Sequence, residues 1–168
     1  MAEHKVEHDA VERLPDIDVF IYHGRIFIPD AYTAGAVGSK FLIELRDNKR
    51  IMGTRCPACN RVYVPARSVC TDFFAQLTEW VEVGDKGTVL TYAVAHQSTV
   101  VQPASPPIVY GIVQLDGADT GLVHMLGEVE FEKLHVGMRV QAVFKEERTA
   151  NILDIKYFRP LCQNPLRK

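Results

Sequence analysis

The sequence predicts a mainly β protein in which an N-terminal arm and helix precede a small cysteine-containing module and a closed barrel of five or six strands. Cys56 and Cys59 form a C-x2-C pair, and Cys70 follows after ten intervening residues. From residue 79 onward, short β-rich segments alternate with turn residues. A chain of 168 residues, 47% of them hydrophobic, can bury one core and carry one small module. We expect the arm at 1–38, the helix and module at 39–78, the barrel at 79–160 and a tail at 161–168.

Composition and charge argue against two classes of protein. The chain has 19 basic and 21 acidic residues and a net charge of −2, whereas a dedicated nucleic-acid binder needs an excess of Lys and Arg. No apolar run approaches the roughly 18–20 residues that would cross a bilayer. The N-terminus is acidic rather than basic and then apolar, unlike a secretory signal. We therefore expect a cytoplasmic protein that binds neither nucleic acid nor membrane.

The N-terminal part of the chain contains two predicted elements. Residues 19–32, VFIYHGRIFIPDAY, hold two β-rich bursts around His23-Gly24, which is typical of a strand or hairpin. Residues 39–49 place Phe41, Leu42 and Leu45 at helical spacing, and Ser39 can serve as the N-cap. We expect an extended arm that lies on another surface, followed by a helix.

The cysteine spacing predicts a zinc ribbon. The tight turn of a C-x2-C knuckle lets two thiolates reach one tetrahedral Zn²⁺ at about 2.3 Å. Residues 61–65 alternate like a short strand and lead toward Cys70, which we take as the third ligand with Cys56 and Cys59. A redox pair is the alternative for the first two cysteines, but such a motif opens a helix inside a βαβ unit, and none is predicted here.

The fourth ligand is less obvious from the sequence. A second knuckle would place it three residues after Cys70, where the chain has Phe73. Asp72 is the candidate we favour, because a carboxylate oxygen can complete a tetrahedral zinc site. Cys162 is the rival, since residues distant in sequence can be close in space. A free cysteine is also often a small buried apolar residue, which is the alternative for Cys162.

Six β-rich segments after the ribbon predict the barrel, with Gly- and Asp-containing turns between them. They span 79–83, 87–94, 107–116, 121–130, 137–147 and 152–160. Residues 95–106 form one long polar connection with prolines, where a binding loop would be sought.

The segment from Lys40 to Arg67 is basic, with seven cations against two acids and thus a local charge of +5. This pattern indicates either a solvated surface or a surface that binds phosphates, such as those of CoA, or an acidic partner. The candidate phosphate-binding residues are Arg46, Lys49, Arg50, Arg55 and Arg67.

Several of these segments resemble, in order, a family long catalogued as a domain of unknown function. The segments are FLIELRDNKRIMGTRCPACNRVYVPARSVC, the Glu79-Trp80 pair, GTVLTYAV, the stretch from Tyr110-Gly111 to Gly117, and GMRVQAVF. The resemblance covers about residues 39–147, and the chain departs from it at Phe73. It implies an N-terminal helix and a rubredoxin-like zinc ribbon joined to a C-terminal OB-fold. Members of the family accompany thiolases and related acyl-CoA enzymes.

The resemblance implies a non-catalytic accessory subunit. Such a subunit docks on a thiolase-superfamily catalytic subunit in a hetero-oligomer, and it shapes or gates an acyl-CoA site, with a CoA thioester as ligand of the complex. The sequence agrees, because its six His residues are scattered and no nucleophile–base arrangement is visible.

The predicted arm and helix carry more apolar residues than a small domain can bury, so we expect them at the partner interface. The candidates are Phe20, Tyr22, Ile26, Phe27, Phe41 and Leu42. Two other functions remain open at this point: a single-stranded nucleic-acid-binding OB module and a stand-alone acyl-CoA hydrolase.

Overall fold

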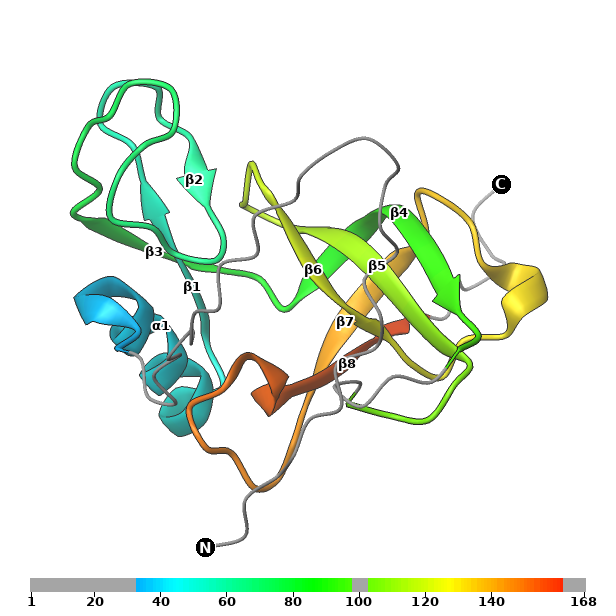
Figure 1. Ribbon diagram of the computed structural model, residues 1–168. Coiled ribbons are helices and arrows are strands. Elements are labelled where there is room, and N and C mark those ends of the chain that lie inside the picture. Colours follow the sequence, from blue (N-terminus) through cyan, green and yellow to red (C-terminus); the bar gives the residue numbers. More distant parts are fainter. Residues whose placement is uncertain (1–32, 98–102, 162–168) are drawn as a thin grey trace, which may run out of the picture. The chain divides into compact units, whose positions relative to one another are not determined.

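The computed structural model describes residues 33–97 and 103–161, which belong to one compact unit (Figure 1). This part of the chain is mainly β, with one α-helix, a small cysteine-containing sheet and a closed barrel, as predicted. None of the helices in the described part has the length and apolar character needed to cross a membrane. The predicted arm, with Phe20, Tyr22, Ile26 and Phe27, lies outside the described residues, as does Cys162.

Helix α1 spans Gly35–Asn48, so it begins four residues before the predicted start. The prediction that Ser39 is the N-cap is wrong, because Ala34 occupies that position and makes no side-chain cap. The Thr33 hydroxyl instead accepts a hydrogen bond from the Gly35 N–H at 3.1 Å. Lys49 is the C-cap that follows the last helical residue. It adopts a left-handed conformation with φ 53° and donates its N–H to the Glu44 carbonyl oxygen.

One face of α1 is part of the core. Phe41 is 3% exposed and Leu45 is fully buried, while Leu42 is half-buried and packs against the same cluster. The expectation that Phe41 lies at a partner interface therefore needs correction, because the core already buries its ring.

The small sheet consists of β1 (Ile51–Arg55), β2 (Val62–Tyr63) and β3 (Glu79–Val83), antiparallel in the order β2-β1-β3. The prediction had counted residues 79–83 among the barrel strands. They pair with β1 instead, and ion pairs of Arg50 with Glu82 and of Arg55 with Glu79 favour this register. The first strand of the barrel is therefore β4.

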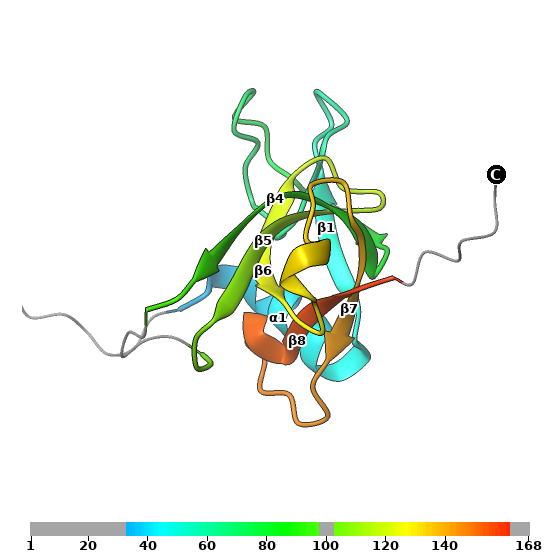
Figure 2. The same cartoon turned by 90° about the vertical axis from the view of Figure 1, so that its right-hand side faces the viewer.

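The barrel closes in the order β4-β5-β6-β8-β7 (Figure 2). Its strands are β4 (Lys86–Ala95), β5 (Ile108–Leu115), β6 (Gly121–Leu126), β7 (Arg139–Phe144) and β8 (Ile155–Pro160). The β6–β8 pair is parallel and the other pairs are antiparallel. Counted along the chain from β4, the five barrel strands therefore follow one another around the barrel in the order 1-2-3-5-4. This arrangement is the five-stranded OB-fold. Gly87 allows β4 to approach the backbone of β5 closely, since a Cβ there would lie 2.5 Å from the Gln114 carbonyl oxygen.

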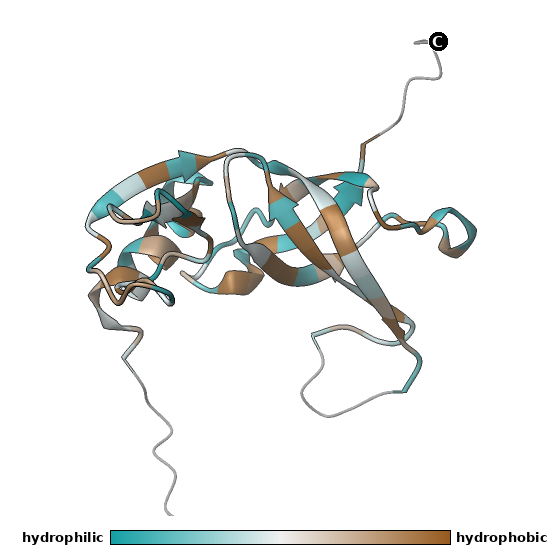
Figure 3. Cartoon of the chain, turned by 90° about the horizontal axis from the view of Figure 1, so that it is seen from above, coloured by the Kyte–Doolittle hydropathy of each residue, from teal (hydrophilic) through white to brown (hydrophobic). Residues whose placement is uncertain are grey.

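Buried residues alternate with more exposed ones along β5 and β6. Figure 3 colours the chain by the hydropathy of each residue. One core cluster joins the inward side chains of the barrel with α1 and the small sheet. Two residues of the turn between β5 and β6 bind β2 and the residue that follows it. The Asp119 carboxylate accepts from the Val62 N–H at 2.8 Å, and the Thr120 hydroxyl accepts from the Val64 N–H at 2.8 Å. The small sheet is thus fixed to the barrel by hydrogen bonds as well as by packing.

His124 is a buried titratable residue of this core. Its Nε2 lies 3.2 Å from the Ile152 carbonyl oxygen, its ring meets Phe158 edge-on, and its Nδ1 has no hydrogen-bond partner among the described residues. Burial lowers the pKa of His124 below its ordinary value, although the hydrogen bond to Ile152 acts in the opposite direction.

We predict that His124 makes the fold less stable in mild acid. Its pKa is lower in the folded state, so the unfolded chain binds the proton more readily. The contribution of neutral His124 to the free energy of unfolding is therefore complete at pH values above the unfolded-state pKa of His, about 6.5, and it is lost as the pH falls below that value. Urea unfolding at several pH values should show a steeper loss of unfolding free energy for the wild type than for His124→Leu. The exposed His135→Gln variant should behave like the wild type, and equal slopes for all three proteins would contradict the prediction.

Candidate metal centre

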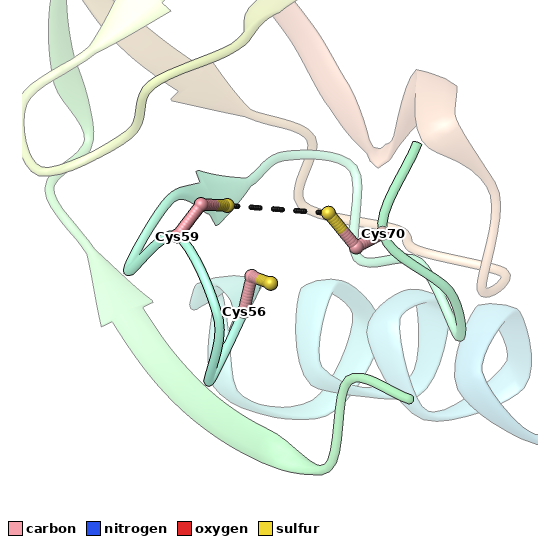
Figure 4. A group of neighbouring side chains, drawn as sticks. All are labelled: Cys56, Cys59 and Cys70. Carbon is pink, nitrogen blue, oxygen red and sulfur yellow. Dashed lines mark hydrogen bonds between the residues drawn. The ribbon is translucent and has the colours of Figure 1, made fainter. Parts of the chain in front are cut away.

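Three free thiols meet at the end of the small sheet. The Sγ atoms of Cys56, Cys59 and Cys70 all lie within 4.8 Å of one another, and those of Cys59 and Cys70 are 3.9 Å apart (Figure 4). Cys56 and Cys70 are buried and Cys59 is half-buried. Sulfur atoms that bind one tetrahedral zinc at 2.3 Å are about 3.8 Å apart, so the cluster fits this metal.

The cysteines lie on two knuckles with the same backbone hydrogen bonds. In the first knuckle, the Asn60 N–H donates to the Cys56 carbonyl oxygen at 2.9 Å; in the second, the Phe74 N–H donates to the Cys70 carbonyl oxygen at 3.1 Å. Asn60 and Phe74 also share a left-handed conformation, with φ of 61° and 52°. In each knuckle the N–H of the first cysteine donates to the carbonyl five residues later. The chain therefore forms both knuckles of a ribbon, although only one has two cysteines.

Phe73 occupies the position in the second knuckle that Cys59 occupies in the first, and it is 59% exposed. Asp72 lies outside the cluster of sulfur atoms. Its carboxylate accepts hydrogen bonds from Arg61 Nη1 at 2.5 Å and from the Thr71 hydroxyl at 3.1 Å. The structure thus brings together three of the four predicted ligands, and the role of Asp72 as the fourth stays a prediction.

The sequence reasoning missed Tyr63, which contacts the cluster from β2. Its hydroxyl lies 3.3 Å from Cys70 Sγ, and this hydrogen bond is the main reason why the pKa of Cys70 falls to about 6. At Cys59 the backbone N–H of Arg61 lowers the pKa, but burial and the neighbouring thiols of Cys56 and Cys70 outweigh it and raise the value. The thiolate is the form that binds a metal, so Tyr63 prepares one ligand for binding.

Most of the predicted phosphate-binding cations already have partners. Arg46 pairs with Asp47 at 2.7 Å, Arg50 with Glu44 at 2.8 Å, and Arg55 with Glu79 at 3.0 Å. Strand β3 contributes Glu79 and Glu82 to these pairs. Both lie outside residues 40–67, for which the local charge of +5 was counted. Within the described residues, Lys49 and Arg67 make no salt bridge with a carboxylate.

These two cations do not share a site. Arg67 lines a groove of about 510 Å³ with the first turn of α1, whereas Lys49 caps the other end of this 14-residue helix, about 21 Å away. The structure therefore divides the five candidate phosphate-binding residues into three that are paired and two separate cations.

Two His residues of the described part, His124 and His135, have backbone carbonyl groups as their hydrogen-bond partners. His124 Nε2 lies near the Ile152 carbonyl oxygen, and His135 Nδ1 lies 2.9 Å from the Lys133 carbonyl oxygen. Neither ring contacts a nucleophilic or carboxylate side chain through these hydrogen bonds. The cysteine cluster is thus the chemical feature of the described residues that the sequence and structure both support.

We predict that the purified chain binds about one zinc and that Cys59→Ser abolishes binding. Cys56, Tyr63, Cys70 and Leu77 form a small core separate from the main one, so the ribbon should unfold locally while the barrel stays folded. Elemental analysis measures the zinc, and far-UV circular dichroism with thermal unfolding follows the barrel. Ser68→Ala serves as the control and should retain zinc. Wild-type protein that contains no zinc after purification without chelators would contradict the prediction.

Comparison with known proteins agrees with both modules. Residues 44–72 match the rubredoxin-like zinc ribbon domain of ChsH2, and residues 80–145 match the C-terminal OB-fold domain of ChsH2. A DUF35 domain-containing scaffold protein of Methanocaldococcus jannaschii is 28% identical over 128 residues, which are 70% of this chain and 86% of the relative.

Two solved structures are similar. A chain of the Ltp2–ChsH2(DUF35) aldolase has a TM-score of 0.55 and 27% identity, covering 73% of this chain and 93% of that one. A DUF35 protein of unknown function from Sulfolobus solfataricus has a TM-score of 0.56 and 22% identity, with coverage of 75% and 84%, and shows the shared fold. The zinc ribbon, the OB-fold and these relatives together establish that the chain belongs to the DUF35 family of zinc-ribbon and OB-fold proteins.

Proposed function

We propose that this chain is a non-catalytic subunit of a thiolase-type acyl-CoA enzyme, which docks on a catalytic subunit and shapes its acyl-CoA site. The observation that carries the proposal is the 27% identity with a chain of the Ltp2–ChsH2(DUF35) aldolase, over 93% of that chain. The relative described as a scaffold protein supports the same role. The reaction in the complex would make or break a C–C bond next to a CoA thioester.

A docking subunit needs a surface that can lose its water at low cost, and the barrel has one. On the outside of β4, β5 and β6, two rows of residues lie side by side across the strands: Thr91, Ile112 and Val123 in one row, and Ala93, Tyr110 and Met125 in the other. We call these six residues the β4–β5–β6 face. All six are exposed or half-buried, and Val123 is 62% exposed.

This face differs from the rest of the barrel in charge. Residues 87–95, 108–115 and 121–126 contain no Asp, Glu, Lys or Arg, whereas β7 and β8 carry Arg139, Lys156 and Arg159. Interface centres are depleted of charge and rich in aromatic residues and Met, as this face is with Tyr110 and Met125. The catalytic subunit is therefore the occupant that we propose for the β4–β5–β6 face.

We predict that Val123→Glu prevents assembly without unfolding the chain. A carboxylate within a dry interface loses its hydration without a partner, which should weaken the complex at least about tenfold. Co-expression with a candidate thiolase-type catalytic subunit, followed by sedimentation analysis, measures the complex. The assay of CoA-dependent C–C cleavage should show turnover for the complex and none for this chain alone.

Val136→Glu is the matched control, because Val136 is 61% exposed but lies outside the β4–β5–β6 face. It should assemble like the wild type. Equal assembly of both variants would place the interface elsewhere, and turnover by this chain alone would contradict the proposed function.

We further propose that Arg67 is the residue of this chain that contacts the phosphates of CoA. The side chain is exposed and unpaired with any carboxylate of the described residues, and it lines the groove beside the first turn of α1. That turn contains no acidic residue, and the amide groups at a helix N-terminus favour anions.

We predict that Arg67→Glu raises the KM of the assembled complex for acyl-CoA, and more at low than at high salt, because exposed charges are screened. Arg159→Glu, an equal charge change on β8, is the control and should leave KM unchanged. Steady-state kinetics at two ionic strengths tests this. If Arg67→Glu assembles normally and keeps the wild-type KM, the CoA contact does not lie here.

A further inference from the structure

The structure brings together three metal ligands from the two knuckles of the ribbon. Their backbone hydrogen bonds and left-handed residues match, so the second knuckle is formed as though it held a fourth ligand at position 73. Phe73, which has no donor atom, occupies that position. Structural zinc sites have four protein ligands, whereas three protein ligands leave a position for water or an added ligand.

We infer that the metal of this ribbon keeps one exchangeable coordination position beside Phe73, where a small thiol from solution binds as its thiolate, displacing water and releasing its proton to solvent. A soft trithiolate site favours sulfur as its further ligand. The inference rests on metal binding by the ribbon, which the three sulfur atoms support, and it goes beyond the proposed role of the chain as a docking subunit.

The surroundings agree with an open position. Among the described residues, no fourth His, Cys, Asp or Glu joins the cluster of three sulfur atoms. Asp72, the nearest candidate in sequence, is held by Arg61 and by the Thr71 hydroxyl. Both oxygens of this carboxylate therefore have partners in the structure, Oδ2 with Arg61 at 2.5 Å and Oδ1 with the Thr71 hydroxyl at 3.1 Å.

The open position also faces solvent. Cys56 and Cys70 are almost fully buried, but Cys59 is half-buried, and Phe73 and Phe74 are 59% and 78% exposed. A small ligand can therefore reach the knuckle from outside without disturbing the core around Cys56. Cys59 is thus the most exposed of the three cysteines.

The test uses the full chain loaded with Co²⁺, whose visible absorption reports the set of ligands. Adding 2-mercaptoethanol to the wild type should shift the d–d bands to a saturating position, with the cobalt still bound after buffer exchange. Phe73→Cys should show the shifted bands before any thiol is added and should not respond to it. This variant should also lose zinc to a chelator at least about tenfold more slowly than the wild type. Mutation of residues that only support a metal ligand already changes metal affinity on this scale.

Phe74→Cys is the matched control, because it adds the same thiol one residue beyond the ligand position and should respond like the wild type. A wild-type spectrum that does not respond to thiol would overturn the inference. So would a changed spectrum in Asp72→Asn or Cys162→Ser, since either result would identify the fourth ligand in the chain. Failure of the wild type to take up cobalt would overturn the metal centre itself, a result distinct from a bound metal that does not respond.

Discussion

The packing of three thiols into one small volume is the constraint on which the ribbon depends. Its separate core consists of Cys56, Tyr63, Cys70 and Leu77, so half of these buried residues are potential metal ligands. A module with so little apolar surface cannot offset the entropy of ordering its chain. Three thiolates this close would also repel one another. A bound cation removes both problems, which explains why the knuckles and the metal ligands coincide.

The turn between β5 and β6 is a structural joint between the ribbon and the barrel. It provides Asp119 and Thr120, which bind the backbone of β2 and of the residue that follows it, and the same two strands form much of the β4–β5–β6 face. The proposed docking surface and the metal centre are therefore connected through short, hydrogen-bonded elements rather than through a flexible linker. A subunit built this way can present its ribbon to a partner in a fixed orientation.

Charge pairing changes how the basic segment is understood. The local sequence suggests an uncompensated surface of five cations, yet β3 brings Glu79 and Glu82 to Arg55 and Arg50. Exposed pairs of this kind contribute little to stability, but they reduce the field that would attract a phosphate. Arg67 is different because its neighbours are the first turn of α1 and the Tyr63 ring, 5.7 Å away.

The sequence by itself determined the features that local patterns encode. Cysteine spacing identified the ribbon, alternation located the barrel strands, and the missing ligand at Phe73 was visible at once. Only the tertiary structure decided which distant residues meet. It placed β3 in the small sheet rather than in the barrel, and it buried Phe41 in the core. It also paired Arg55 with Glu79, 24 residues away in the sequence, and Val62 with Asp119, 57 residues away. Periodicity reports which face of an element is apolar, but not which partner covers that face, because pairing depends on the packing of the whole chain.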